Sequence, residues 1–98
     1  MTDQDVSEYW NQNAAAWTAL TRAGADVCRD AYNTPTFLKM LPDVSGLEGL
    51  DVGCGEGNNT RLVAERGANM SAIDLSRPLV QAAIEQENRV ALGISYSI

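Results

Sequence analysis

The residues best placed to do chemistry form a glycine-rich segment in the second half of the chain. Gly53, Gly55 and Gly57 alternate with Cys54 and Glu56, directly after an apolar stretch that reads as a strand. Glycines at such a turn remove Cβ atoms, so the backbone can turn sharply and a ligand can approach the N-terminus of the next helix. The sequence therefore predicts a ligand-binding turn between a strand and a helix.

Two acidic residues flank this turn. Asp51 precedes it on the first predicted strand, and Asp74 follows it at the end of the second. A carboxylate in the position of Asp74 can accept hydrogen bonds from both hydroxyls of a ribose. Asp51 suits a cationic group better than a phosphate, which it would repel; the alternative is a strand acid satisfied by backbone donors. A ligand with both a ribose and an ammonium group points to S-adenosylmethionine.

The spacing of the glycines argues against a dinucleotide site. A dinucleotide fingerprint runs G-x-G-x-x-G/A, and its third small residue lets the helix pack close to the strand. Here Asn58 occupies that position, and the third glycine comes one residue earlier. A Rossmann fragment that binds NAD or FAD stays open as the alternative, because it would share the strand-helix-strand unit and Asp74.

The composition argues against several other kinds of site and partner. There is no histidine among the 98 residues, which removes Ser-His and Cys-His nucleophile systems. Cys28 and Cys54 form no CxxC pair, so we expect no metal site; both thiols are expected to be free in a reducing cytoplasm, with a disulfide as the alternative. Thirteen acidic against seven basic residues argue against a nucleic-acid partner. No signal peptide and no apolar run of spanning length is present, so no membrane partner is expected.

The chain after residue 46 alternates short apolar segments with helical ones. The pattern predicts strands over 47–52, 69–74 and 94–98, separated by a helix over 58–66 and by a second that Ser76 caps and Gly93 ends. This βαβαβ order implies a parallel sheet with helical crossovers, as in a Rossmann-like, doubly wound α/β domain.

Residues 1–45 are predicted to form a helical N-terminal arm. A first amphipathic helix starts at the acids Asp3 and Asp5 and reaches Gly24, and a short second helix lies around residues 26–32. Thr34 is expected to cap a third helix over 36–41 whose first helical position is Pro35.

The glycine turn and the second acid together resemble two motifs of the class I S-adenosylmethionine-dependent methyltransferases. The segment Leu50-Asp51-Val52-Gly53-Cys54-Gly55-Glu56-Gly57 looks like motif I, and Ala72-Ile73-Asp74-Leu75-Ser76 resembles the acidic motif of the second strand. The resemblance implies a seven-stranded sheet, of which residues 46–98 form the first half. It also implies S-adenosylmethionine as cofactor, S-adenosylhomocysteine as product and a small molecule as methyl acceptor.

The resemblance also assigns roles to individual residues. The glycines lie along the methionine moiety, Asp51 faces its amino end, Asp74 holds the ribose and Leu75 flanks the adenine. The arm, with Tyr9, Trp10 and Trp17, resembles the helical region that covers the cofactor in small-molecule members; packing on the helix face is the alternative for these aromatic residues. The expected cofactor-binding residues are thus Tyr9, Trp17, Asp51, Gly53, Cys54, Gly55, Gly57, Asn58, Asp74 and Leu75.

Several expectations follow from what the chain lacks. Cys54 is read as a small loop filler, because no basic neighbour in the sequence would lower its pKa. No catalytic residue is identified.

The first strand, central in the family's sheet, would be an open edge here, which predicts a longer protein or a homo-oligomer that covers it. A non-catalytic oligomeric fragment is a further alternative. Gly49 and residues 68–71 are weak strand formers, so poor strands are expected there.

Overall fold

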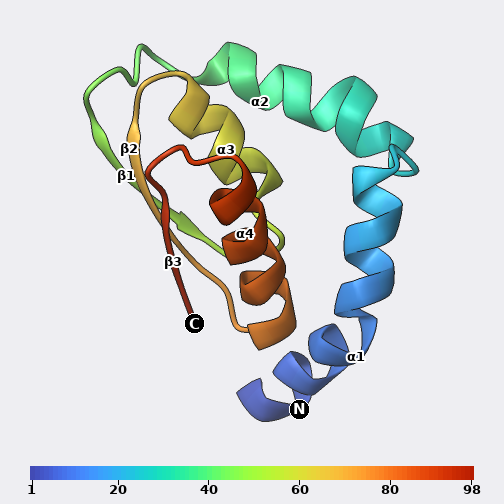
Figure 1. The fold of residues 1–98 in the computed structure, drawn as a ribbon. Coiled ribbons are helices and arrows are strands. Elements are labelled where there is room, and N and C mark those ends of the chain that lie inside the picture. Colours follow the sequence, from blue (N-terminus) through green and yellow to red (C-terminus); the bar gives the residue numbers. More distant parts are fainter.

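A computed structural model describes all of residues 1–98, and its centre is a three-stranded parallel sheet (Figure 1). The strands are β1 (Glu48–Val52), β2 (Asn69–Ile73) and β3 (Ser95–Ser97), hydrogen-bonded in the order β1-β2-β3. Each predicted strand is present, and the observed ends differ from the expected ones by at most one residue. The predicted parallel α/β sheet is therefore confirmed.

Two helices connect the strands and cover one face of the sheet. Helix α3 (Asn58–Glu65) joins β1 to β2, and α4 (Arg77–Arg89) joins β2 to β3. Both lie on the same face, and no helix covers the opposite face (Figure 1). The winding thus proceeds in a single direction, as expected for successive right-handed crossovers that add each new strand to the same edge. The core lies between the sheet and these helices, around Val63, Ala68, Met70 and Ile94.

Gly49, a weak strand former in β1, makes room for the core. It lies opposite Met70 in the parallel register. A Cβ atom at Gly49 would lie 2.5 Å from the Met70 sulfur. The flexible Met70 side chain therefore occupies the space that a β-branched residue at position 49 would need.

Strand β1 is an outer strand whose second edge has no partner, as the sequence predicts. Its side chains alternate between half-buried and exposed. Leu50 and Val52 point to the uncovered side and are 62% and 72% exposed. Unpaired backbone groups beside apolar side chains can template pairing with another strand.

The N-terminal arm begins with α1 (Asp3–Arg22), which packs against α4. Its start is fixed by a capping box in which the Thr2 hydroxyl accepts from the Asp5 N–H, while the Asp5 carboxylate accepts from the Thr2 N–H. The helix ends two residues before Gly24, the predicted stop. No helix of the structure combines the length and the apolar character needed to cross a membrane.

The predicted cap at Thr34 is wrong. A π-helical segment, η1 (Arg29–Asn33), runs directly into α2 (Thr34–Met40), and both Asn33 and Thr34 have right-handed helical backbone angles. Pro35 has no N–H, and its ring would clash with a carbonyl one turn earlier in a regular α-helix. The wider π turn before Pro35 accommodates the ring, so the chain continues as a helix where the sequence pattern predicted a new start.

Helix α4 begins as predicted, but it ends earlier than expected. The Ser76 hydroxyl accepts from the Leu79 N–H, 3.5 Å away, and Pro78 lies in the first turn. At the other end, the Glu87 carboxylate accepts from the backbone N–H groups of Leu92 and Gly93. These bonds draw the following loop back against the helix, so α4 stops at Arg89 rather than near Gly93.

The cap of α4 provides a test of the fold. Ser76 is fully buried, and its hydroxyl also donates to the Asn11 side chain of α1 at 2.8 Å. We expect Ser76→Ala to lower the free energy of unfolding by about 1–2 kcal/mol, because it removes a cap and leaves the Asn11 oxygen without this donor. Urea denaturation followed by circular dichroism measures the change. The control is Ser97→Ala, at an exposed strand position, and an equal loss in both variants would contradict the assignment.

Candidate functional site

A cavity of about 630 Å³ opens at the carboxyl ends of the strands, and residues of α1 also line it. This is the end of an open α/β sheet where ligands bind, and the volume lies within the usual range for small-molecule sites. Its lining comes from the ends of β1 and β2, the glycine loop, the start of α3 and the arm. The lining residues used below are Trp10, Trp17, Arg29, Asp51, Gly53, Cys54, Gly55, Glu56, Asn58, Asp74 and Leu75.

Asp74 joins the end of β2 to the glycine loop. One carboxylate oxygen accepts from the Gly55 N–H at 2.9 Å, and the other accepts from the Ser76 N–H at 2.8 Å. Because each carboxylate oxygen has two acceptor sites, both keep one for a further donor such as a ribose hydroxyl. The carboxylate is thus oriented before any ligand arrives.

Asp51 lines the same cavity from β1, and a residue that the sequence analysis did not single out holds it in place. The Thr60 hydroxyl donates to the Asp51 carboxylate at 2.7 Å, and Thr60 is fully buried in α3. The hydrogen-bond partner of Asp51 is therefore a side chain and not the backbone N–H groups that the sequence analysis gave as the alternative. Thr60 is the third residue of α3. The sequence could have suggested that it pairs with Asp51 only if the packing of this helix on β1 had been known.

The loop between β1 and α3 is shaped by its contacts with β2. The backbone N–H groups of Gly53 and Cys54 both donate to the Ile73 carbonyl, at 2.8 and 3.0 Å. Gly57 does not line the cavity. It forms the left-handed N-cap of α3 with φ of 91°, and a Cβ atom there would lie 2.6 Å from the Tyr96 hydroxyl. A glycine is needed at position 57 because the backbone there is left-handed and leaves no room for a Cβ atom, and not because the residue contacts a ligand.

Cys54 lies in the loop with a protonated thiol at neutral pH. Burial, followed by the negative charges of Asp74 and Asp51, raises the pKa of Cys54 to about 12. Both causes disfavour the thiolate, which is the nucleophilic form. The side chain therefore fills the loop without offering a nucleophile.

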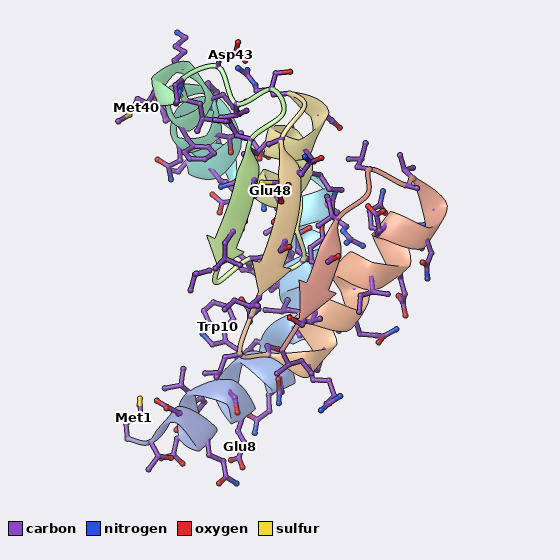
Figure 2. The ribbon with its side chains drawn as sticks, turned by 90° about the vertical axis from the view of Figure 1, so that its left-hand side faces the viewer. Met1, Glu8, Trp10, Met40, Asp43 and Glu48 are labelled. Carbon is purple, nitrogen blue, oxygen red and sulfur yellow. The ribbon has the colours of Figure 1, made fainter.

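The arm contributes part of what the resemblance led us to expect. Trp10 and Trp17 line the cavity, and their rings meet edge to face with centroids 6.0 Å apart. Figure 2 shows Trp10 projecting from α1 beyond the carboxyl ends of β1 and β2. Tyr9 does not line the cavity; it is 60% exposed and lines a neighbouring groove of α1 that shares Trp10 and Trp17 with the cavity. The expected cofactor contact of Tyr9 is therefore not supported by its position.

The structure adds two charged residues to which the sequence analysis assigned no role. Arg29 from η1 is the single cationic side chain that lines the cavity. Glu56, within the glycine loop, is only 4% exposed and pairs with Arg29 and with two further arginines. Nothing in the spacing of the arginines marks them as partners of Glu56, because they lie on three different helical elements.

Together these residues can hold a polar molecule that carries charges of both signs. Asp51 offers a negative charge and Arg29 a positive one, while Asp74 offers acceptors for hydroxyl groups. Apolar surface from Trp10 and Leu75 lines the remaining walls. A zwitterionic amino acid joined to a nucleoside matches this combination of groups.

Comparisons with known proteins agree with this chemistry. Residues 50–97 match the family model described as "Methyltransferase domain". The chain is 32% identical to a magnesium-protoporphyrin O-methyltransferase of Rhodobacter capsulatus over 80% of this chain and 39% of that protein. An S-adenosylmethionine-dependent methyltransferase structure from Mesorhizobium loti is 36% identical, with a TM-score of 0.58 over 64% of this chain and 28% of the other.

These matches decide the family. The chain belongs to the S-adenosylmethionine-dependent methyltransferases. A phosphoethanolamine N-methyltransferase structure from Haemonchus contortus, which contains S-adenosylhomocysteine, covers the whole chain and 22% of the other with a TM-score of 0.79. Because the two chains are only 20% identical, this likeness supports the shared fold and nothing more. The chain spans about two fifths of the length of the Rhodobacter relative.

The environment of Cys54 gives a pH-dependent prediction. With a pKa of about 12, the Cys54 thiolate amounts to roughly one part in ten thousand at pH 8. We expect iodoacetamide to modify the exposed Cys28 at least about tenfold faster than Cys54, and the Cys54 rate to keep rising as the pH is raised above 8. Mass spectrometry of the labelled peptides measures both rates. In urea the two cysteines should react alike; equal rates in the folded chain would show that Cys54 is not buried beside these acids.

Proposed function

We propose that this methyltransferase chain forms the S-adenosylmethionine-binding part of an enzyme that methylates a small molecule. The observation that carries the proposal is the cavity at the ends of β1 and β2, where Asp74 is already oriented by Gly55 and Ser76. The family model covers the same strands and loop. A dinucleotide-binding site is not favoured, because the matching relatives are methyltransferases and Asn58 interrupts the dinucleotide spacing.

Each end of the cavity suits one part of the cofactor. Asp74 would accept from the ribose hydroxyls, and Leu75 would lie against the adenine. At the other end, Asp51 would face the ammonium group and Arg29 the carboxylate of the methionine moiety, because both charged side chains line the same cavity. Gly53 and Gly55, with Cys54 and Asn58, would leave room along the cofactor backbone, while Gly57 would act through the shape of the loop.

The bound cofactor supplies an activated methyl group, so the protein's task is to align an acceptor with the S–CH₃ bond and to exclude water. Trp10 and Trp17 would form an apolar wall on the acceptor side. The Rhodobacter relative is named for magnesium-protoporphyrin, and the Haemonchus structure contains phosphoethanolamine. Both are small molecules, which supports a small-molecule acceptor here. No residue of this chain is assigned as a catalytic acid or base.

Two organisational features belong to the same proposal. Residues 1–45 would form an arm over the site, and residues 46–98 would form the first half of the cofactor-binding domain. Both cysteines are free, Cys28 exposed and Cys54 partly buried, which suits a reducing cytoplasm.

Calorimetric titration of the 98-residue chain with S-adenosylhomocysteine tests the cofactor site. We expect binding that Asp74→Asn weakens about tenfold or more, because the neutral amide loses a charged acceptor for the ribose while it keeps the size of the side chain. The control is Asp43→Asn, whose carboxylate lies in the exposed loop before β1 and accepts only from the Ser45 N–H.

The possible outcomes separate the alternatives. Equal affinity in Asp74→Asn and the unmodified chain would remove Asp74 from the site. If the chain binds NADH and does not bind S-adenosylhomocysteine, the result favours a dinucleotide-binding site. Absence of any binding would contradict the proposal that these residues hold the cofactor by themselves.

We further propose that a second copy of the chain pairs with the open edge of β1. The unpaired edge beside the exposed side chains of Leu50 and Val52 supports this. Light scattering should then give about twice the monomer mass of 10.5 kDa. Leu50→Lys should shift the chain to monomer, because a lysine beside the edge opposes strand pairing. A stable monomer of the unmodified chain at high concentration would refute the proposal.

A further inference from the structure

The side chain of Glu56 is the most completely paired acid of the structure. It lies in the glycine loop and is 4% exposed. Arg22 Nε and Arg61 Nη2 each lie 3.5 Å from Oε2, and Arg29 Nη1 lies 3.4 Å from Oε1. A buried carboxylate without such partners would be strongly unfavourable. The three arginines compensate the buried negative charge of Glu56.

These arginines come from different parts of the chain. Arg61 belongs to α3, which begins directly after the loop, so its contact with Glu56 is local. Arg22 is the last residue of α1, and Arg29 is the first residue of η1. Two of the three ion pairs thus cross from the N-terminal arm to the glycine loop.

Further hydrogen bonds make the same connection. Arg22 Nη2 donates to the backbone carbonyls of Glu56 and Ala82, at 3.4 and 3.2 Å. Arg29 Nη2 donates to the Thr21 carbonyl at 3.1 Å, which ties η1 to the last turn of α1. The turn between α1 and η1 is therefore held to the loop through guanidinium groups that converge on one residue.

The contacts at the two ends of α1 differ in kind. Near its N-terminal half, α1 is held by the neutral hydrogen bond from Ser76 to Asn11. At its C-terminal end, it is held by the charged cluster around Glu56. Trp10 and Trp17, which line the cavity, lie on this helix, so their position over the site depends on both attachments.

Arg29 connects the cluster to the cavity itself. It is the cation among the lining residues, and its guanidinium is held by Glu56 and by Asp30, whose carboxylate lies 3.2 Å from Nε. The cluster contains three guanidinium groups and two carboxylates, which leaves one positive charge in excess. That excess lies where an anionic group of a ligand could meet it.

We propose that Glu56 is a positioning residue that latches the N-terminal arm onto the glycine loop and thereby closes the cavity and fixes Arg29 at its wall. Its effect on ligand binding rests on the proposed function, whereas the docking of the arm does not. The proposal predicts an asymmetry among the arginines. Loss of Arg22 or Arg29 releases the arm, but loss of Arg61 leaves it docked.

Hydrogen–deuterium exchange with mass spectrometry tests this on the 98-residue chain. In Arg29→Gln we expect the amides of α1 to exchange about tenfold faster or more, while those of β2 keep their rates. Arg61→Gln is the matched control, because it removes the same kind of group from the same carboxylate but on the loop side. Tryptophan emission gives a second readout, since Trp10 and Trp17 are the two tryptophans and both lie on α1.

Glu56→Gln should produce the same local release, with Glu65→Gln at an exposed position of α3 as its control. If Glu56→Gln unfolds the chain, the comparison of Arg29→Gln with Arg61→Gln still decides. Equal effects of the two arginine variants on α1, or no effect of Arg29→Gln, would overturn the latch.

The affinity for S-adenosylhomocysteine separates this inference from the proposed function. If both hold, Arg29→Gln and Glu56→Gln bind about tenfold more weakly or worse, and Glu65→Gln binds as the unmodified chain does. If the unmodified chain does not bind, the proposed cofactor site fails while the exchange data still test the latch. If the arm is released but the affinity stays unchanged, the latch does not position the site and that part of the inference is wrong.

Discussion

The structure around the cavity depends on the hydrogen bonds that fasten the glycine loop to the end of β2. Asp74 accepts from the Gly55 N–H, and the Ile73 carbonyl accepts from the N–H groups of Gly53 and Cys54. Without these bonds the loop would carry several unpaired backbone donors near a buried surface, which is costly. The same carboxylate, that of Asp74, both fixes the backbone of the loop and lines the cavity. The shape of the loop and the polar lining of the cavity therefore depend on one residue.

Burial of charge explains why the arm lies where it does. The loop turns Glu56 inward, and a buried carboxylate requires partners that its own segment supplies only in part, through Arg61. The arm supplies the remaining guanidinium groups from Arg22 and Arg29. The hydrophobic contribution of α1 is modest, since Trp17 and Leu20 stay 37% and 57% exposed. Polar and ionic contacts therefore join the packing of α1 against α4 in holding the arm in place.

The sheet illustrates how composition and context interact. Gly49 is a poor strand former by propensity, yet its missing side chain admits Met70 to the core. The covered face carries the buried residues of β2, whereas Leu50 and Val52 face the side without helices. Two crossovers of the same hand can cover only one face, so the second face and the outer edge of β1 are left for another segment or chain.

The sequence by itself determined the order of strands and helices, the glycine turn and the two acids beside it, because alternation, helix caps and glycine spacing are local signals. It also predicted Trp17 and Asn58 as cofactor-binding residues, and both line the cavity. It wrongly predicted Thr34 as the N-cap of α2. Only the tertiary structure decided that Tyr9 does not line the cavity, that Thr60 holds Asp51 and that Arg22 and Arg29 of the arm meet Glu56. Those outcomes depend on how separate elements pack, and neither the spacing nor the type of a residue encodes a contact between elements that the chain brings together only on folding.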